Sequence, residues 1–104
     1  MIKKAFQFGV MAALMVGTST AMAAGAELRE ARLSATGTSA QLTLDVAGTT
    51  TQKVFTLDRP WRVVIDLAHT GVVRGFRAPE GAGVVSDIRT GHQIGGTLRI
   101  VVQL

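Results

Sequence analysis

The stretch Val54–Gly71, which reads VFTLDRPWRVVIDLAHTG, constrains the fold of this chain more than any other. On both sides of a polar break at Asp58–Trp61, apolar residues recur at every second position, which is the signature of strands with one buried face. Pro60 cannot donate a ladder hydrogen bond and suits the second position of a type I turn, so the chain should reverse between Arg59 and Arg62. The stretch therefore predicts a β-hairpin.

Side-chain parity predicts a register for this hairpin. If Leu57 pairs with Val63, Phe55 falls beside Ile65 on the same buried face. The other face then carries Arg62, Val64 and Asp66.

The first residues of the chain have the pattern of a secretory signal peptide. Lys3 and Lys4 precede an apolar run, Ala5–Gly17, and the small-residue pattern Ala21-Met22-Ala23 follows. The run is shorter than the roughly 20 residues that span a bilayer. We expect a helical signal peptide over residues 1–23 and a mature domain over residues 24–104. Cleavage after Ala26 is the second choice, and an uncleaved membrane anchor is the remaining alternative.

No twin-arginine pair occurs in this leader, which favours the general secretion route and a periplasmic location. The formal charge of the chain is +4, and removal of Lys3 and Lys4 leaves +2. With Lys53 as its single remaining lysine and no basic run, the mature chain does not fit a nucleic-acid partner. Scattered arginines instead suit a polymer that carries carboxylates. The chain has no cysteine, which excludes disulfides and thiolate chemistry.

Two further segments precede the central hairpin. Ala40–Val46 alternates apolar and polar residues and predicts a strand. Glu27–Ser34 has helix-forming composition, but it is short and ends at the turn cluster Thr36–Ser39, so we interpret it as a strand. The glycine-rich passage from His69 to Gly83 predicts no regular helix, with room for one short strand or turn.

A second hairpin is predicted at the end of the chain, around Ile94–Gly96. A two-residue turn would bury one polar side chain for each apolar one. A three-residue loop instead pairs Ile88 with Val102, and a glycine at its end supplies the positive φ that such loops need. The same register pairs Thr90 with Ile100 and Arg89 with Val101, and places on one outward face Arg89, Gln93 and Arg99. About six strands result, which indicates a small antiparallel sandwich or open barrel.

The runs LDRPWRVVIDL and VSDIRTGHQIGGTLRIVVQL resemble the AMIN domain, a β-sheet module found ahead of the catalytic domain of exported N-acetylmuramoyl-L-alanine amidases. The resemblance covers nearly all of the chain after residue 26, and His92 departs from the pattern by displacing Gln93 one position. The matching residues are Leu57, Arg62, Val63, Ile65, Asp66, Leu67, Ile88, Arg89, Gly91, Gln93, Leu98, Arg99 and Val101.

The resemblance implies an all-β fold of two packed antiparallel sheets with about six or more short strands. It also implies a non-catalytic module over residues 24–104 that binds peptidoglycan and targets a cell-wall amidase, with septal targeting and cell-division proteins as further partners. The zinc ion of such amidases is expected in the catalytic domain, so no cofactor is expected in this chain. The alternative is the AMIN-type module that tethers a type IV pilus secretin to the cell wall. No membrane partner is expected after signal cleavage.

An enzymatic role needs a site that the sequence does not favour. A catalytic zinc ion needs three protein ligands, and the imidazoles available are His69 and His92, with Glu80 the nearest carboxylate between them. We interpret both histidines as surface residues. The chain also lacks a Gly-x-Ser-x-Gly elbow and a phosphate-binding glycine loop, so neither catalytic nor metal-binding residues are assigned.

Six residues are candidates for binding. Arg89, Gln93 and Arg99 offer two guanidinium groups and an amide to stem-peptide carboxylates and sugar hydroxyls, against the alternative of a solvated sheet face. Arg62 and Asp66 lie roughly 13 Å apart along one strand and cannot pair with each other, so each needs a cross-strand partner or a ligand, and structural pairing is favoured. Trp61 could stack on a sugar ring, although packing against the sheet edge is the commoner role.

Overall fold

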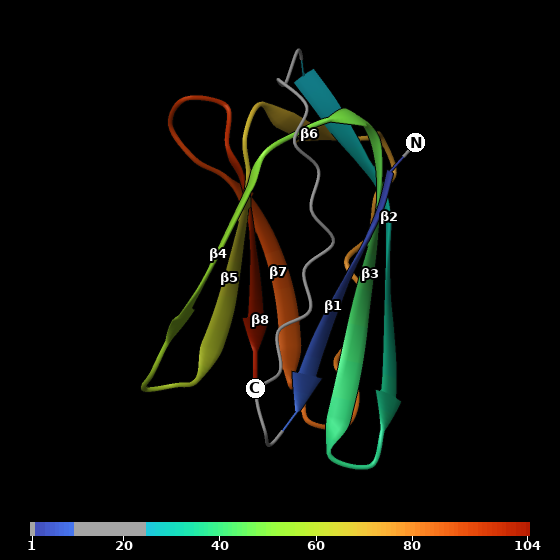
Figure 1. Cartoon of the computed structure of the whole chain (residues 1–104), viewed down its shortest axis with the longest axis vertical. Helices are drawn as coiled ribbons and strands as arrows, with labels where there is room; N and C mark the ends of the chain where they lie inside the picture. The colour runs from blue at the N-terminus through green and yellow to red at the C-terminus, as the bar shows by residue number, and fades with distance from the viewer. Residues whose placement is uncertain (1, 10–24) are drawn as a thin grey trace.

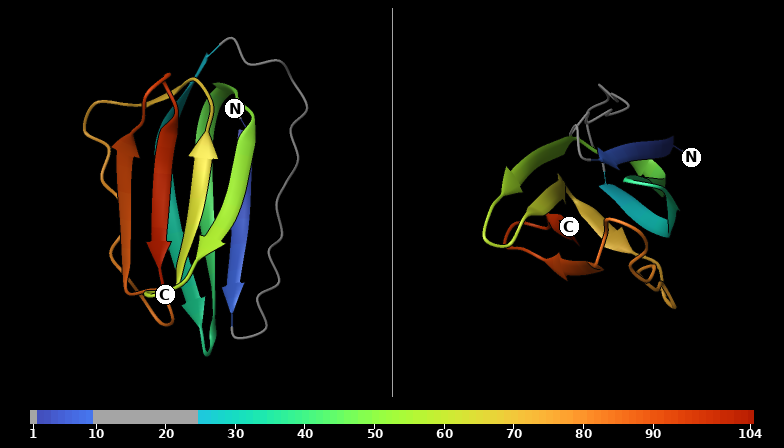
Figure 2. Two further views of the ribbon diagram at one scale, coloured as in Figure 1. Left: turned by 90° about the vertical axis from the view of Figure 1, so that its left-hand side faces the viewer. Right: turned by 90° about the horizontal axis from the view of Figure 1, so that it is seen from below.

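The computed structural model describes residues 2–9 and 25–104, and for residues 2–9 the description is confined to the backbone. The described residues form two sheets that face each other, with strand orders β1-β3-β2-β6 in sheet A and β4-β5-β8-β7 in sheet B (Figures 1 and 2). The expected all-β, two-sheet fold is thereby confirmed. The strands are β1 (Ile2–Gly9), β2 (Gly25–Thr36), β3 (Ser39–Thr49), β4 (Gln52–Leu57), β5 (Arg62–Leu67), β6 (Thr70–Val72), β7 (Asp87–His92) and β8 (Leu98–Gln103).

The core lies between the two sheets and follows from strict alternation along their central strands. Ile65 on β5 and Ile100 on β8 are 0% and 1% exposed and face one another in register. From the other sheet β3 contributes every second residue from Ala40 to Val46, all of them buried. Phe76 packs against this core from the long loop between β6 and β7. No helix that could cross a membrane occurs within residues 2–9 and 25–104.

Sheet A contains the pairing that sequence pattern could not predict. β2 and β3 form the expected hairpin around Gly37 and Thr38. The short strand β6, which was anticipated in the glycine-rich passage, pairs with β2 in parallel, from Ala26↔Thr70 to Leu28↔Val72. The other strand pairings of the two sheets are antiparallel, as expected.

The register of the β4–β5 hairpin differs by one residue from the prediction. Leu57 faces Arg62 and Phe55 faces Val64, so the reversal occupies residues 58–61 rather than Arg59–Arg62. The Arg59–Pro60 peptide is cis, whereas a type I turn was expected. The physical reason is that Val54 takes the core-facing position, which leaves Phe55 on the outer face of sheet B.

The β7–β8 hairpin has the predicted register. Ile88 faces Val102, Thr90 faces Ile100 and Arg89 faces Val101. The amide of Gln93 donates to the carbonyl of Thr97 at 2.8 Å, which closes the three-residue loop. Gly96 at the end of that loop has a φ of 82°, as the loop type requires.

The leader was expected to be helical, and its described part is not. Residues 2–9 form β1, which pairs antiparallel with β3 from Ile2↔Val46 to Gly9↔Ser39. The reason lies in β3, because a sheet edge offers unpaired backbone donors and acceptors to any extended segment nearby. The rest of the expected signal peptide, including the cleavage position after Ala23, lies outside the described residues.

The two sheets are joined at one end by a pair of buried threonines. Thr50 lies between β3 and β4, and Thr70 begins β6 after the chain leaves sheet B, and they are 0% and 3% exposed. The hydroxyl of Thr50 donates to the carbonyl of Ala68 at 2.7 Å. The hydroxyl of Thr70 lies 3.0 Å from that of Thr50 and 2.9 Å from the same carbonyl. Within residues 25–104, two of the three crossings between the sheets, β3–β4 and β5–β6, are therefore fastened to each other.

We expect Thr50→Val to lower the free energy of unfolding by about 1–3 kcal/mol, because it leaves the carbonyl of Ala68 and the buried hydroxyl of Thr70 with one partner fewer. Urea denaturation followed by circular dichroism measures the change. Thr51→Val is the matched control, since Thr51 is exposed. Equal effects of the two substitutions would show that the buried hydroxyl adds nothing to stability.

Candidate functional site

The outer face of sheet B is the face of β4, β5, β8 and β7 that points away from the core. The registers set its side chains in three rows across the four strands. The first row contains Leu57, Arg62, Gln103 and Asp87; the second Phe55, Val64, Val101 and Arg89; the third Lys53, Asp66, Arg99 and Gly91.

Asp66 and Arg99 form a two-pronged ion pair in the third row. Nε of Arg99 donates to Oδ1 of Asp66 at 2.9 Å and Nη2 donates to Oδ2 at 3.0 Å. The pair is only partly exposed, and the hydrogen bonds to Asp66 raise the pKa of Arg99 above its ordinary value. The cross-strand partner expected for Asp66 is therefore Arg99, and the role of the pair is to hold β5 against β8.

Phe55 is the apolar centre of the same surface. The guanidinium carbon of Arg99 lies 5.6 Å from the centre of its ring, and Nζ of Lys53 lies 5.9 Å from it. Cations at such distances are attracted by the negative face of an aromatic ring. Val64, which faces Phe55 in register, is 2% exposed although it points away from the core. Arg99 is thus restrained by both a carboxylate and a ring.

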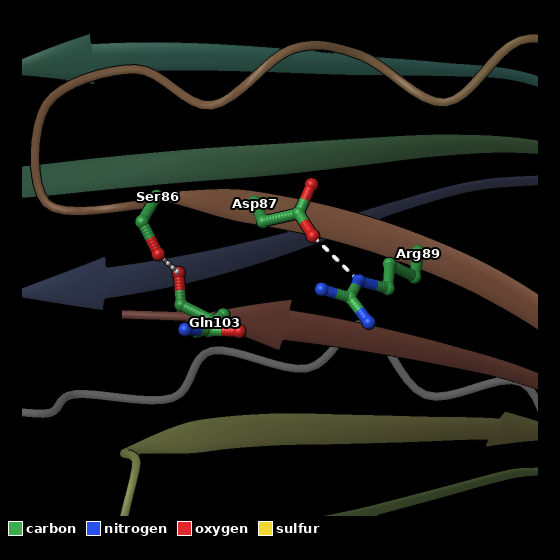
Figure 3. A network of polar contacts seen from close by, with 4 residues as sticks. All are labelled: Ser86, Asp87, Arg89 and Gln103. Atoms are coloured by element: carbon green, nitrogen blue, oxygen red, sulfur yellow. Dashed lines mark hydrogen bonds and ion pairs between the residues drawn. The ribbon is translucent and has the colours of Figure 1, made fainter.

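A hollow of about 240 Å³ lies at the end of this face nearest the β4–β5 turn. Nε of Arg89 donates to Oδ2 of Asp87 at 2.6 Å, which keeps the guanidinium beside the neighbouring strand β8 (Figure 3). Nε of Arg62 donates to the carbonyl of Pro60 at 3.2 Å. Ser86 anchors the end of β8 from the other side, since its hydroxyl and its amide both donate to the carbonyl of Gln103. The hollow is lined by Pro60, Arg62, Asp87, Arg89, Val101 and Gln103.

The ion pair with Arg89 lowers the pKa of Asp87, chiefly through their hydrogen bond. A carboxyl group whose pKa is lower in the folded chain stabilises the fold above its unfolded pKa of about 4 and loses that contribution as pH falls. Asp87→Asn should therefore lower the free energy of unfolding at pH 6 and have a smaller effect at pH 3. Urea titrations at the two pH values measure this. Asp58→Asn, in the exposed turn, controls for the loss of a carboxylate, and a pH-independent effect of Asp87→Asn would contradict the assignment.

The structure divides the predicted binding residues between the two ends of this face. Arg89 and Arg62 line the same hollow, which sequence reasoning did not bring together. Arg99 is at the opposite end, opposite Gly91, and Nε2 of Gln93 would lie 4.0 Å from a Cβ placed on that glycine. All three residues of the predicted Arg89, Gln93 and Arg99 set thus lie on the β7–β8 side, where Arg89 and Arg99 are in neighbouring rows but pair with different carboxylates, Asp87 and Asp66.

Trp61 does not pack on the sheet edge, which was the commoner role. Its side chain is 63% exposed, and its carbonyl accepts a hydrogen bond from the amide of Leu104 at 2.9 Å. Trp61 stands between Pro60 and Arg62 in the chain, and both of these neighbours line the hollow. An exposed tryptophan beside two arginines suits ligands that combine flat apolar faces with charge.

Two residues of the hollow, Asp87 and Gln103, were missed as site residues. The predicted register of the β7–β8 hairpin already implied that they face each other, and this was the signal that could have found them. The histidines give no metal site: within residues 2–9 and 25–104 no three histidine, aspartate or glutamate side chains gather closely enough to hold an ion. His69 and His92 are both exposed.

Comparison with known proteins places the chain in a family. The family model for the AMIN domain matches residues 30–104. The match spans β3 to β8, and hence every residue of the hollow and of the Asp66–Arg99 pair. No curated protein and no solved structure matches the chain.

Proposed function

Because the chain belongs to the AMIN domain family, we propose that it binds peptidoglycan through the outer face of sheet B and thereby positions a cell-wall hydrolase. The AMIN domain is a non-catalytic domain that suggests a peptidoglycan-binding or targeting module. AMIN domains occur in exported periplasmic proteins, which agrees with the signal peptide proposed for this chain.

The observation that carries the proposal is the position of Arg62 and Arg89 on one hollow. Peptidoglycan offers carboxylates on its stem peptides and hydroxyl and amide groups on its glycan. A guanidinium group can hold a carboxylate through two parallel hydrogen bonds, and an amide such as that of Gln103 can both donate and accept. Each arginine uses Nε for its contact inside the protein, which leaves the two terminal nitrogens of the guanidinium for a ligand.

Trp61 supports the same assignment. It is exposed in the turn that also supplies Pro60 and Arg62 to the hollow, and an exposed indole can cover the apolar face of a sugar. The site is shallow, so one contact would be weak. Repetition of the ligand along the polymer raises the overall affinity, because a second module or a rebinding event acts at high effective concentration.

We assign the hydrolase as an N-acetylmuramoyl-L-alanine amidase, with its zinc ion in a catalytic domain separate from this β domain. Septal targeting and contact with cell-division proteins belong to this proposal. A type IV pilus secretin is the rival context, and the identity of the domain that accompanies this one in the exported protein decides between them. Further β modules would replace the amidase assignment, and a domain with three zinc ligands would support it.

The test is co-sedimentation of the exported chain with purified insoluble peptidoglycan sacculi. The same sacculi with their free carboxyl groups converted to amides are the matched ligand control. Binding to native sacculi and much weaker binding to amidated sacculi is the expected result. Equal binding to both would remove the arginine–carboxylate contact, and binding to neither would remove the peptidoglycan assignment.

A further inference from the structure

The outer edge of β3 is the feature of the sandwich that the proposed function leaves unexplained. In the structure β1 lies along this edge in an unbroken antiparallel register that ends at Ile2↔Val46 and Gly9↔Ser39 (Figure 1). β1 belongs to the leader that export is proposed to remove. After that removal the backbone donors and acceptors of β3 that β1 now pairs would be without partners.

β3 lacks the devices that keep other edge strands from pairing. Natural edges are protected by lysine, proline, bulges or shortness. Within Ser39–Thr49 the sequence has no lysine, arginine or proline, and Asp45 is its single charged residue. The bulge in sheet A lies on the β2 side, between Leu28 and Glu30. The edge strand β6 has only three residues, and the edge strand β4 carries Lys53.

β3 is complementary to a second copy of itself. If two copies meet antiparallel with Thr43 opposite Thr43, Leu42 faces Leu44 and Ala40 faces Val46 on the core side, while Gln41 faces Asp45 on the outer side. Directly opposite residues of an antiparallel pair share one face of the sheet, so this register keeps every apolar residue with an apolar one.

The backbone geometry allows this register. The two-residue turn between Thr36 and Ser39 sets the hydrogen-bonding parity of β2 and β3, so the backbone groups of Ala40, Leu42, Leu44 and Val46 point to the free edge. When Thr43 lies on the two-fold axis, each of these four residues in one copy is opposite another of the four in the second copy. Thr43 then forms a pair without backbone hydrogen bonds, in which side chains approach most closely.

Asp45 also lies on this edge, where it is in register with Lys3 of β1 while the leader is present. In the two-fold register the amide of Gln41 from the second copy lies opposite Asp45 and can donate to its carboxylate.

We propose that the processed chain forms a two-fold dimer by pairing β3 with β3 of a second copy, across the edge that β1 occupies in the unprocessed chain. The proposal rests on removal of the leader, not on the nature of the wall ligand. A dimer has two outer faces of sheet B, so it also supplies the two-site contact that a weak polymer-binding surface benefits from.

Disulfide trapping tests the register directly, because the chain has no cysteine of its own. Thr43→Cys, exported to the oxidising periplasm, should migrate as a reducible dimer on a non-reducing gel. The Cα atoms of such a pair lie about 4.5 Å apart, within the range that a disulfide spans. Ser34→Cys is the matched control: it is exposed on β2, opposite Gln41, and cannot reach its copy. Monomeric Thr43→Cys, or equal crosslinking of both variants, would overturn the proposal.

The oligomeric state of the processed chain gives a second readout that needs no disulfide. Sedimentation velocity should show a dimer for the wild type and for Ser34→Lys, but a monomer for Thr43→Lys, which places two like charges directly opposite one another. Thermal unfolding of each variant shows that the monomer is folded. A monomeric wild type, or a mass spectrum in which the leader is still attached, would overturn the proposal. Both assays measure pairing between copies and neither measures binding to peptidoglycan, so failure here leaves the wall-binding proposal to its own test.

Discussion

Arg62→Ala combined with Arg89→Ala is expected to abolish sedimentation of the chain with peptidoglycan sacculi. Both guanidinium groups border the same hollow, and each can make hydrogen bonds to a ligand carboxylate. Hydrogen bonds to charged groups contribute about 1.5–3 kcal/mol each, so loss of both should weaken binding by about 100-fold or more. The measurement is the bound fraction as a function of sacculus concentration.

Arg74→Ala combined with Arg77→Ala is the matched control for this variant. It also removes two positive charges, but from exposed positions in the loop between β6 and β7. We expect its binding to stay close to that of the wild type. If both double variants lost binding equally, the attraction would be a general effect of net charge and the hollow would have no special role.

Ile65→Ala is expected to have the largest effect on stability. Ile65 is fully buried on β5, a central strand of sheet B, and its removal leaves a cavity between the two sheets. Such substitutions cost about 2–5 kcal/mol, a large part of the roughly 5–15 kcal/mol by which a domain is stable. For a domain of this size we expect Tm to fall by at least about 10 °C in a scanning calorimeter.

The same substitution at Ile94 is the control. Ile94 is 103% exposed at the tip of the β7–β8 loop, so Ile94→Ala removes the same atoms without creating a cavity. Its Tm should stay within about 4 °C of the wild type, since surface substitutions change stability by about 0.5 kcal/mol or less. A comparable loss in both variants would mean that the core between the sheets is not the main source of stability.

The second hairpin was predicted in full because its parity leaves little choice. Residues 98–103 alternate strictly between core and outer face, and one loop length alone matches them to β7. The first hairpin was predicted one residue out of register, because Val54 and Phe55 are both apolar and either can face the core. Phe55 lies on the outer face, opposite Val64 and near the cationic groups of Lys53 and Arg99, and the contact with Arg99 depends on a strand far away in the sequence.

The candidate site could be predicted in part of its residues but not in its arrangement. Arg62 and Asp66 were expected on one face of the first hairpin, and Arg89 and Arg99 on one outward face of the second; the structure places all four on the outer face of sheet B. Their partners depend on β5 and β8 being neighbours, and strand order does not follow from alternation within each strand. The Asp66–Arg99 pair and the shared hollow of Arg62 and Arg89 are consequences of that order.

The buried threonine pair has a consequence for how the sandwich opens. Thr50 and Thr70 fasten two of the three sheet crossings in the described part of the chain, β3–β4 and β5–β6, to each other at one end of the molecule, whereas the turns of the β2–β3 and β4–β5 hairpins lie at the other end (Figure 1). Opening of the fold should therefore proceed like a hinge, with backbone amides near Arg62 and Gln103 exchanging with deuterium before those near Leu67 and Leu98. Uniform exchange along β5 and β8 would contradict this. The hollow lies at the opening end and is formed by sheet B alone, so a ligand bound there would restrain the ends of β5, β7 and β8 against one another.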